Sequence, residues 1–230
     1  MSSKGSFSQM AETLRSFGIE GLTPQLVAET EAGYSQMMAE CQSVPDSWVV
    51  KMLIAEFMGE DTSTISMEEE RVAEIASALL FSVGCGTTDR VTWAWSPSNS
   101  TVYTFDREVA DLSSMYTDFP RGAAALGQGE LAFQNIVEDL GGVDREKGCG
   151  RRKVCFQWDG RICLLEAEEN NDWFDVSFIS KLNQLILQGG GEKRLFCANC
   201  SQGCAVFYRS PQWAAAFQEA TGLSLSEDGN

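Results

Sequence analysis

The chain has 230 residues, with 33 acids against 17 bases and a formal net charge of −16. That charge repels nucleic-acid phosphates and anionic membrane surfaces, so it argues against both as partners. It suits a basic protein partner or a cation, but plain solubility is the more common reason for such a charge. Histidine is absent. The usual general base, the Ser-His and Cys-His nucleophile pairs and the commonest zinc ligand are therefore missing, which argues against hydrolase activity.

The length fits one large domain or two small ones, and 43% hydrophobic residues can form a core. The polar residues 1–6 are followed by no secretory apolar core, and no apolar run has the length of a membrane helix. We therefore expect a cytoplasmic protein. In a reducing cytosol its eight cysteines should be thiols, metal ligands or redox-active groups, and not structural disulfides.

The first 88 residues are predicted to be helical. A threonine N-cap followed by proline opens a helix over about 24–41, and a second helix is expected over 45–59. The capping box in residues 66–69 precedes apolar residues at three- and four-residue spacing, which predict a third helix that ends at Gly84.

The apolar period then changes from about 3.6 to 2, which indicates strands. Residues 91–95 and 101–105 are predicted to form a hairpin across a longer loop. The stretch 113–129, with three glycines, is expected to be irregular. Residues 131–140 are predicted to form a helix that ends at Gly141 and Gly142.

The last eighty residues alternate hairpins with helices. Asp159 and Gly160 are the strongest short-range hairpin signal and should join strands 154–158 and 161–165, with Phe156 opposite Cys163. The remaining predictions are a helix over 173–187, a hairpin of strands 194–196 and 205–208, and a helix over 211–220 capped by Ser210 and ended by Gly222.

These elements predict an α+β fold, in which a helical N-terminal part is followed by an antiparallel sheet built of hairpin-helix-hairpin-helix units. With the hairpin over 91–105 the sheet would reach six strands. We expect a helical region over 1–88 and an α+β antiparallel-sheet domain over 89–230. A single core shared by both parts is the alternative.

Three thiols, those of Cys197, Cys200 and Cys204, cluster at the tip of the hairpin predicted over 194–208. Thiolates suit zinc or iron, so these residues are the candidate metal ligands. A fourth ligand is missing nearby, and buried cysteine in a strand is also ordinary apolar filler. We therefore predict no cofactor, with zinc or iron at this cluster as the alternative.

Two other polar segments each have a functional interpretation and a more ordinary one. The acidic run 166–172 could hold calcium or magnesium. It lacks the alternating oxygen positions and the central glycine of an EF-hand loop, so a solvated loop is expected. Asp172 or Asp175 should cap the helix that follows. Residues 151–153 are the compact basic patch of the sequence and could bind an anion, although three exposed bases are commonplace.

The sequence favours a non-enzymatic interaction or regulatory module that binds a basic protein partner. The alternative from another class is a metal-binding or redox protein that uses Cys197, Cys200 and Cys204. An enzyme working through carboxylates or a cofactor stays open, as do the oligomeric state and the identity of the partner.

Overall fold

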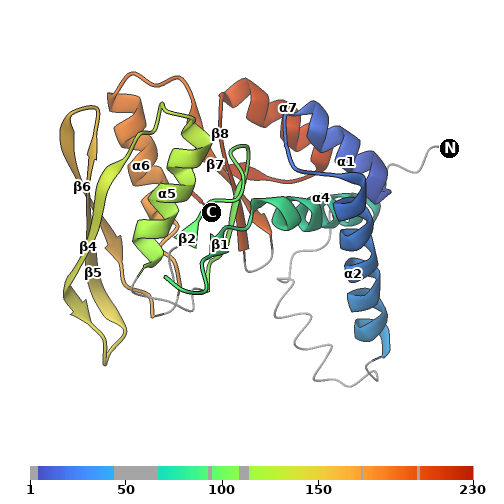
Figure 1. The fold of residues 1–230 in the computed structure, drawn as a ribbon, viewed down its shortest axis with the longest axis horizontal. Helices are drawn as coiled ribbons and strands as arrows, with labels where there is room; N and C mark the ends of the chain where they lie inside the picture. The colour runs from blue at the N-terminus through green and yellow to red at the C-terminus, as the bar shows by residue number, and fades with distance from the viewer. Residues whose placement is uncertain are drawn as a thin grey trace.

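A four-stranded sheet runs through the middle of the molecule in the computed structural model, which describes residues 5–43, 67–92, 95–108, 114–171, 173–200 and 203–229 (Figure 1). The predicted helix over 45–59 lies outside these residues. The sheet has the order β3-β8-β7-β9, and each neighbouring pair is antiparallel. Its strands are β3 (Tyr103–Asp106), β7 (Arg194–Cys200), β8 (Gly203–Arg209) and β9 (Leu225–Ser226).

A group of helices lies on one face of this sheet (Figure 1). They are α1 (Phe7–Ser16), α2 (Pro24–Ser43), α4 (Met67–Gly84) and α7 (Pro211–Thr221). Here α4 contacts β3 and β8, and α2 packs farther out against α1 and α4. The Thr23 hydroxyl accepts a hydrogen bond from the Leu26 amide, as an N-cap does. Ala198, Ala205 and Phe207 of the sheet share a buried cluster with these helices.

The opposite face of the sheet packs on α5 (Met115–Gly127) and α6 (Ser177–Gln188). Beyond these helices lies a second sheet of order β4-β5-β6, with β4 (Gln134–Asp144), β5 (Cys149–Trp158) and β6 (Arg161–Glu168). In Figure 1 this sheet forms the left edge of the molecule, and α5 and α6 lie on its inner side. The molecule is thus a stack of helices, sheet, helices and sheet, and the α+β class is confirmed.

The two-residue turn at Asp159 and Gly160 is confirmed. Both residues have positive φ, 50° and 70°, which is the conformation of the type I′ turns that match strand twist. Phe156 pairs with Cys163 and Cys155 with Leu164. Because opposed residues share a face and neighbours alternate, Cys155 and Cys163 point to opposite sides of the sheet, as predicted.

The ends of the helices also follow local sequence signals. The Ser210 hydroxyl accepts a hydrogen bond from the Trp213 amide at the start of α7, and Gly222 ends the helix with φ of 72°. The predicted helix over 173–187 begins later, at Ser177, because Trp173 instead forms isolated β-bridges with Asn170 and Glu108.

The predicted helix over 131–140 is wrong, because residues 134–140 belong to β4. Ile136, Glu138 and Leu140 are half-buried while the residues between them are exposed, which is a period of two. Gly141 and Gly142 do not end a helix. They lie at a register shift in the pairing of β4 with β5, which is a β-bulge. Glycine suits this position because it has no side chain.

The stretch 113–129 is not irregular, because most of it forms α5. Pro120 lies inside this helix, where it removes one hydrogen bond. The buried residues Met115, Phe119, Ala123 and Leu126 recur at helical spacing, so burial of this face outweighs the loss.

The hairpin predicted over 91–105 is not found among the described residues, which leave out 93 and 94. β3 pairs with β8, while the short β2 (Trp95–Ser96) pairs with β1 (Thr87–Thr88). The expected six-stranded sheet is likewise divided, since β5 and β6 belong to one sheet and β7 and β8 to another. Within the described residues, no helix combines the length and the hydropathy needed to span a bilayer.

Candidate binding surface

The three candidate thiols do not share one side of the central sheet. Cys197 and Cys204 belong to the buried cluster beneath α5 and α6, whereas Cys200 belongs to the cluster beneath the N-terminal helices. The register explains this, because Cys200 follows Cys197 by three residues in a single strand. Among the described residues no group of three or more potential ligands surrounds a point where a metal could bind.

Cys197 and Cys204 are in contact, and the contact changes their acidity. The hydrogen bond between the two thiols raises the pKa of Cys197 and lowers that of Cys204, and the positive charge of Arg107 also favours the Cys204 thiolate. Burial raises the pKa of Cys200, whose thiol contacts Ser77 instead. Cys197 and Cys204 therefore form a pair, and Cys200 stands apart.

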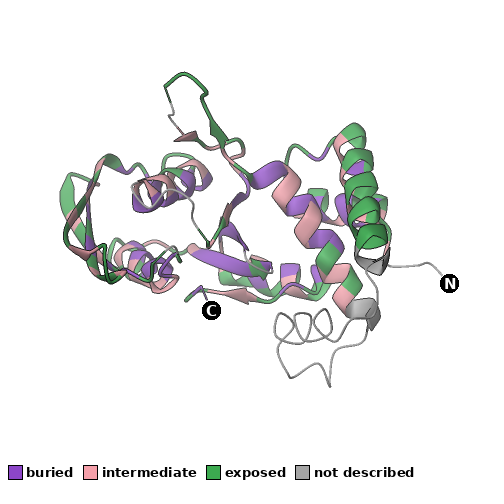
Figure 2. Ribbon diagram, turned by 90° about the horizontal axis from the view of Figure 1, so that it is seen from below, coloured by how far each residue is buried: buried purple, intermediate pink, exposed green. Residues whose placement is uncertain are grey.

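The outer face of the three-stranded sheet carries an apolar row. Val137 pairs with Cys155, and Cys155 pairs with Leu164, so these three side chains lie side by side across the strands. Val137 is 60% exposed and Leu164 58%, and the nearby Ile162 is 76% exposed. We call Val137, Cys155, Ile162 and Leu164 the apolar row. Figure 2 shows green, exposed residues along this left-hand sheet, with no described element outside it.

A charged row lies beside the apolar row on the same face. Lys153 pairs with both Asp139 and Glu166, so two carboxylates flank one ammonium. Next along the strands, Arg151 Nε donates to Glu168 Oε1 at 2.9 Å. An exposed apolar strip bordered by charges has the make-up of a protein-binding surface, in which contacts with the partner cover the apolar centre.

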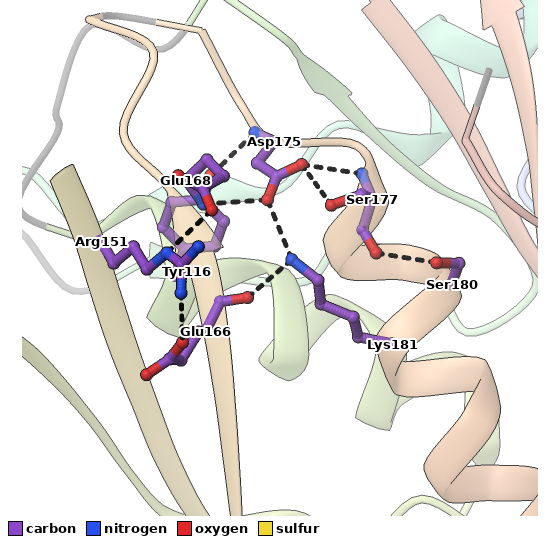
Figure 3. Close-up of polar contacts among 8 residues, drawn as sticks. All are labelled: Tyr116, Arg151, Glu166, Glu168, Asp175, Ser177, Ser180 and Lys181. Carbon is purple, nitrogen blue, oxygen red and sulfur yellow. Dashed lines mark hydrogen bonds and ion pairs between the residues drawn. The ribbon is translucent and has the colours of Figure 1, made fainter. Parts of the chain in front are cut away.

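A polar network ties the far end of β6 to the beginning of α6 (Figure 3). Asp175 Oδ2 accepts hydrogen bonds from the Glu168 amide at 2.9 Å and from Lys181 Nζ at 3.3 Å. Lys181 Nζ also donates to the main-chain oxygen of Glu166 at 2.9 Å. Asp175 Oδ1 accepts from the amide of Ser177, the first residue of α6, while the N-cap position itself is Val176, one residue after Asp175. Asp172 lies outside the described residues.

The network determines the charge state of Asp175. Burial alone would raise the pKa of its carboxyl, but the hydrogen bonds from Ser177 and Glu168 and the charge of Lys181 outweigh burial. The pKa of Asp175 consequently lies below its ordinary value of 3.8. Asp175 is thus a carboxylate at neutral pH and holds β6 against α6.

The predicted basic patch is divided by the strand. Arg151 is exposed, but Arg152 is 2% exposed and points into the core with Val154 and Phe156. The Arg152 guanidinium pairs with Glu138 at 2.6 Å and with Glu169. The alternation of the strand was the signal for this arrangement, because Arg152 shares the parity of the apolar residues.

The acidic run 166–172 is accordingly not a solvated loop throughout. Residues 166–168 belong to β6, and Glu169 is buried beside Arg152. Burial raises the pKa of Glu138, and the hydrogen bond and charge of Arg152 oppose that rise. This buried ion cluster fixes β4 and the end of β6 against β5, beneath the outer face.

A cleft of about 580 Å³ opens where the hairpin turn of β5 and β6 meets the end of α6. Its wall includes the main chain of Gly189–Gly191, the hairpin residues Trp158 and Asp159, and the first half of β6. Trp158 Nε1 donates to the main-chain oxygen of Glu130 at 3.1 Å, which anchors the indole. The cleft therefore has an ordered aromatic wall next to the exposed residues Ile162 and Leu164.

Charges of both signs lie in and beside the cleft wall. Glu130 and Asp159 line it with one base, Arg161, and the C-terminal end of α6 adds the negative end of a helix dipole. The ammonium of Lys193, 2.5 Å from Glu130, lowers the pKa of that carboxyl. Burial and the charge of Glu130 raise the pKa of Tyr208 to about 12, so Tyr208 is neutral there.

Comparison of the chain with models of known protein families, with curated proteins and with solved structures found no match.

Proposed function

We propose that this protein is a non-enzymatic interaction module that binds a basic protein partner on the outer face of the sheet of β4, β5 and β6. The apolar row carries the proposal, because three of its side chains are more than half exposed and lie together on one face. Burying a leucine-sized side chain in an interface stabilises a complex by about 1.5–3 kcal/mol. The row is therefore able to contribute most of a modest affinity.

Charge supports the choice of a basic partner. The net charge of −16 attracts positive surfaces and raises the encounter rate with them. Acidic residues border the apolar row at Asp139 and Glu166, and α2 contains Glu29, Glu31 and Glu40 without a basic residue. A cytoplasmic location belongs to this proposal, because the exposed thiols of Cys85 and Cys149 need reducing conditions to stay free.

The test uses tagged protein to capture partners from cell extract at low salt. The matched variants are the double substitution Val137→Ser with Leu164→Ser, and Val91→Ser, which changes an 86% exposed valine in the segment between β1 and β2. We expect a basic protein to bind wild type and the Val91→Ser control equally. The double variant should bind it at least about tenfold more weakly, which corresponds to about 1.4 kcal/mol. Equal loss in the control, or capture of acidic proteins alone, would contradict the proposal.

The contact between Cys197 and Cys204 favours a second candidate, a dithiol that reacts with a partner disulfide. Cys204 is the more acidic thiol of the pair, since its pKa is lowered while that of Cys197 is raised. Both side chains are buried, so the reaction requires local opening around β7 and β8. Attack by Cys204 on the partner disulfide and resolution by Cys197 would leave a Cys197–Cys204 disulfide and two partner thiols.

Redox titration in glutathione buffers, followed by mass spectrometry, tests this candidate. A Cys197–Cys204 disulfide should form in wild type and in Cys200→Ser, because Cys200 faces the other way. Absence of that disulfide at every ratio of oxidised to reduced glutathione would exclude the redox candidate.

A further inference from the structure

The two outer edges of the sheet of β4, β5 and β6 differ in regularity. β4 is interrupted by two register shifts in its pairing with β5, and Asn135 has a positive φ of 51°. Such bulges twist an edge and prevent another strand from pairing with it. β6, in contrast, pairs with β5 without a shift over all eight of its residues. Its outer edge is therefore straight enough to accept a further strand.

The main chain of β6 presents alternate residues to that outer edge. The oxygen of Glu166 bonds to Lys181 and the amide of Glu168 to Asp175, so both residues direct their peptide groups away from β5. In an antiparallel ladder this direction repeats every second residue. Ile162 and Leu164 therefore also direct their amide and carbonyl groups outward.

Only one half of the edge is covered. Lys181 and Asp175 of the α6 region occupy the hydrogen-bonding groups of residues 166–168, as Figure 3 shows. In the described part of the chain, no hydrogen bond from another element reaches the main chain of Ile162 or Leu164. These two residues line the cleft of about 580 Å³ beside α6. An open edge and a cleft thus coincide at the first half of β6.

We infer that an extended segment of the basic partner adds to the sheet as a fourth strand, pairing with Ile162 and Leu164 and placing a basic side chain in the cleft. This inference rests on the proposed function and specifies its binding mode. Strand addition draws affinity from main-chain hydrogen bonds and specificity from pockets for alternate side chains. Glu130 and Asp159 line the cleft, and with the C-terminal end of α6 they offer groups that a lysine or arginine side chain can contact beside Arg161 and Lys193.

The binding mode is tested with a short capped peptide in which valine alternates with arginine. Hydrogen exchange of each amide is followed by NMR with and without this peptide. In the free protein, Cys163 and Leu165 should be protected by β5, and Ile162 and Leu164 should exchange freely. Saturating peptide should slow exchange at Ile162 and Leu164 at least about tenfold.

Two altered peptides leave the protein unchanged. N-methylation of the peptide amides that face β6 removes hydrogen bonds, and glutamate in place of arginine reverses the charge. Each should weaken binding at least about tenfold. Protection of Ile162 and Leu164 in the free protein would mean that a second copy already occupies the edge, which overturns the inference. No protection with the valine-arginine peptide overturns it equally.

A protein variant provides an independent readout. Ile162→Pro deletes the outward amide hydrogen, and proline is tolerated on edge strands, while Ile162→Val keeps the amide. Peptide binding should fall at least about tenfold in Ile162→Pro and stay unchanged in Ile162→Val. If a basic partner binds and depends on Leu164 while Ile162→Pro binds it normally, the interaction module stands and strand addition fails. If the peptide adds to β6 but no basic protein is captured, strand addition stands and the proposed interaction module fails.

Discussion

The ammonium of Lys181 lies 2.9 Å from the main-chain oxygen of Glu166, so a side chain of α6 occupies the edge of β6 that a neighbouring strand would otherwise use. Lys181 also reaches Asp175, which accepts the Glu168 amide. The outward main-chain groups of β6 are therefore hydrogen-bonded at Glu166 and Glu168 but, among the residues described, not at Ile162 and Leu164. This division directs a partner to the half of β6 that borders the cleft.

Asp175 should make stability depend on pH in the acidic range. Its pKa in the folded protein is below the ordinary 3.8. Its stabilisation is therefore complete above about pH 4 and is lost as the pH falls through the folded pKa. Asp175→Asn should lower the free energy of unfolding at neutral pH by about 1–2 kcal/mol and flatten the acid dependence. Urea unfolding across this pH range checks both effects.

Ser180→Ala is the matched control for Asp175→Asn, since Ser180 bonds only to the nearby oxygen of Ser177. Its unfolding free energy should stay close to that of wild type, with an unchanged acid dependence. An Asp175→Asn protein with the acid dependence of wild type would show that the network in Figure 3 does not hold a carboxylate.

Arg152 should matter more for stability than either of its carboxylate partners. Arg152→Met would leave Glu138 and Glu169 buried without their cation, a change that costs about 3–5 kcal/mol. Glu138→Gln leaves the pair of Arg152 with Glu169 and should cost about 1–2 kcal/mol. Chemical denaturation of both variants measures the difference. Equal losses would mean that the three groups are not one buried ion cluster.

Gly122 and Gly33 should respond to alanine with opposite signs. Both lie inside helices, where alanine is favoured by about 1 kcal/mol. At Gly122 a Cβ would meet the Tyr103 ring at 2.6 Å, and that ring is packed against Phe105 and Phe119. Overpacking costs about 1–3 kcal/mol, so Gly122→Ala should destabilise.

Gly33 has no atom within 4 Å of the position of a new Cβ. Gly33→Ala should therefore stabilise the protein by about 0.5–1 kcal/mol. Thermal unfolding of the two variants side by side separates the effects. A gain in melting temperature for Gly122→Ala would show that α5 and β3 are not packed as described.

Turns and helix ends were predictable because their signals are local. Asp159 and Gly160 are residue types that tolerate the positive φ of a two-residue hairpin turn. Ser210 accepts a hydrogen bond from an amide only three residues away. The separation of Cys155 from Cys163 followed from the same turn. For the thiols, the strand period already implied that Cys197 and Cys200 face opposite ways, and that signal was missed.

β4 and α5 were not predictable from local pattern. Glu138 is a charged residue at an inward-facing position of β4, so the alternation of apolar and polar residues typical of a strand is hidden there. Its inward position is possible because Arg152 from β5 pairs with it. α5 includes Pro120, and its stability comes from packing of Phe119 against Phe174 and Phe178. The open edge of β6 likewise depends on where α6 lies, which no spacing in the sequence reveals.

The purified protein should carry less than about one equivalent of zinc or iron, because three thiols divided between two faces cannot surround one ion. Elemental analysis measures this directly. Stoichiometric metal that disappears on Cys200→Ser would instead support the metal-binding alternative.

The most direct test of the account is the affinity of the captured basic partner as salt is raised. Attraction to a chain of net charge −16 is screened over a Debye length of about 8 Å at physiological ionic strength. We expect the association rate to fall steeply with salt and the affinity to weaken at least about tenfold. An affinity unchanged from low to high salt, or tight binding to duplex DNA or anionic vesicles, would contradict the claim that charge selects a basic protein.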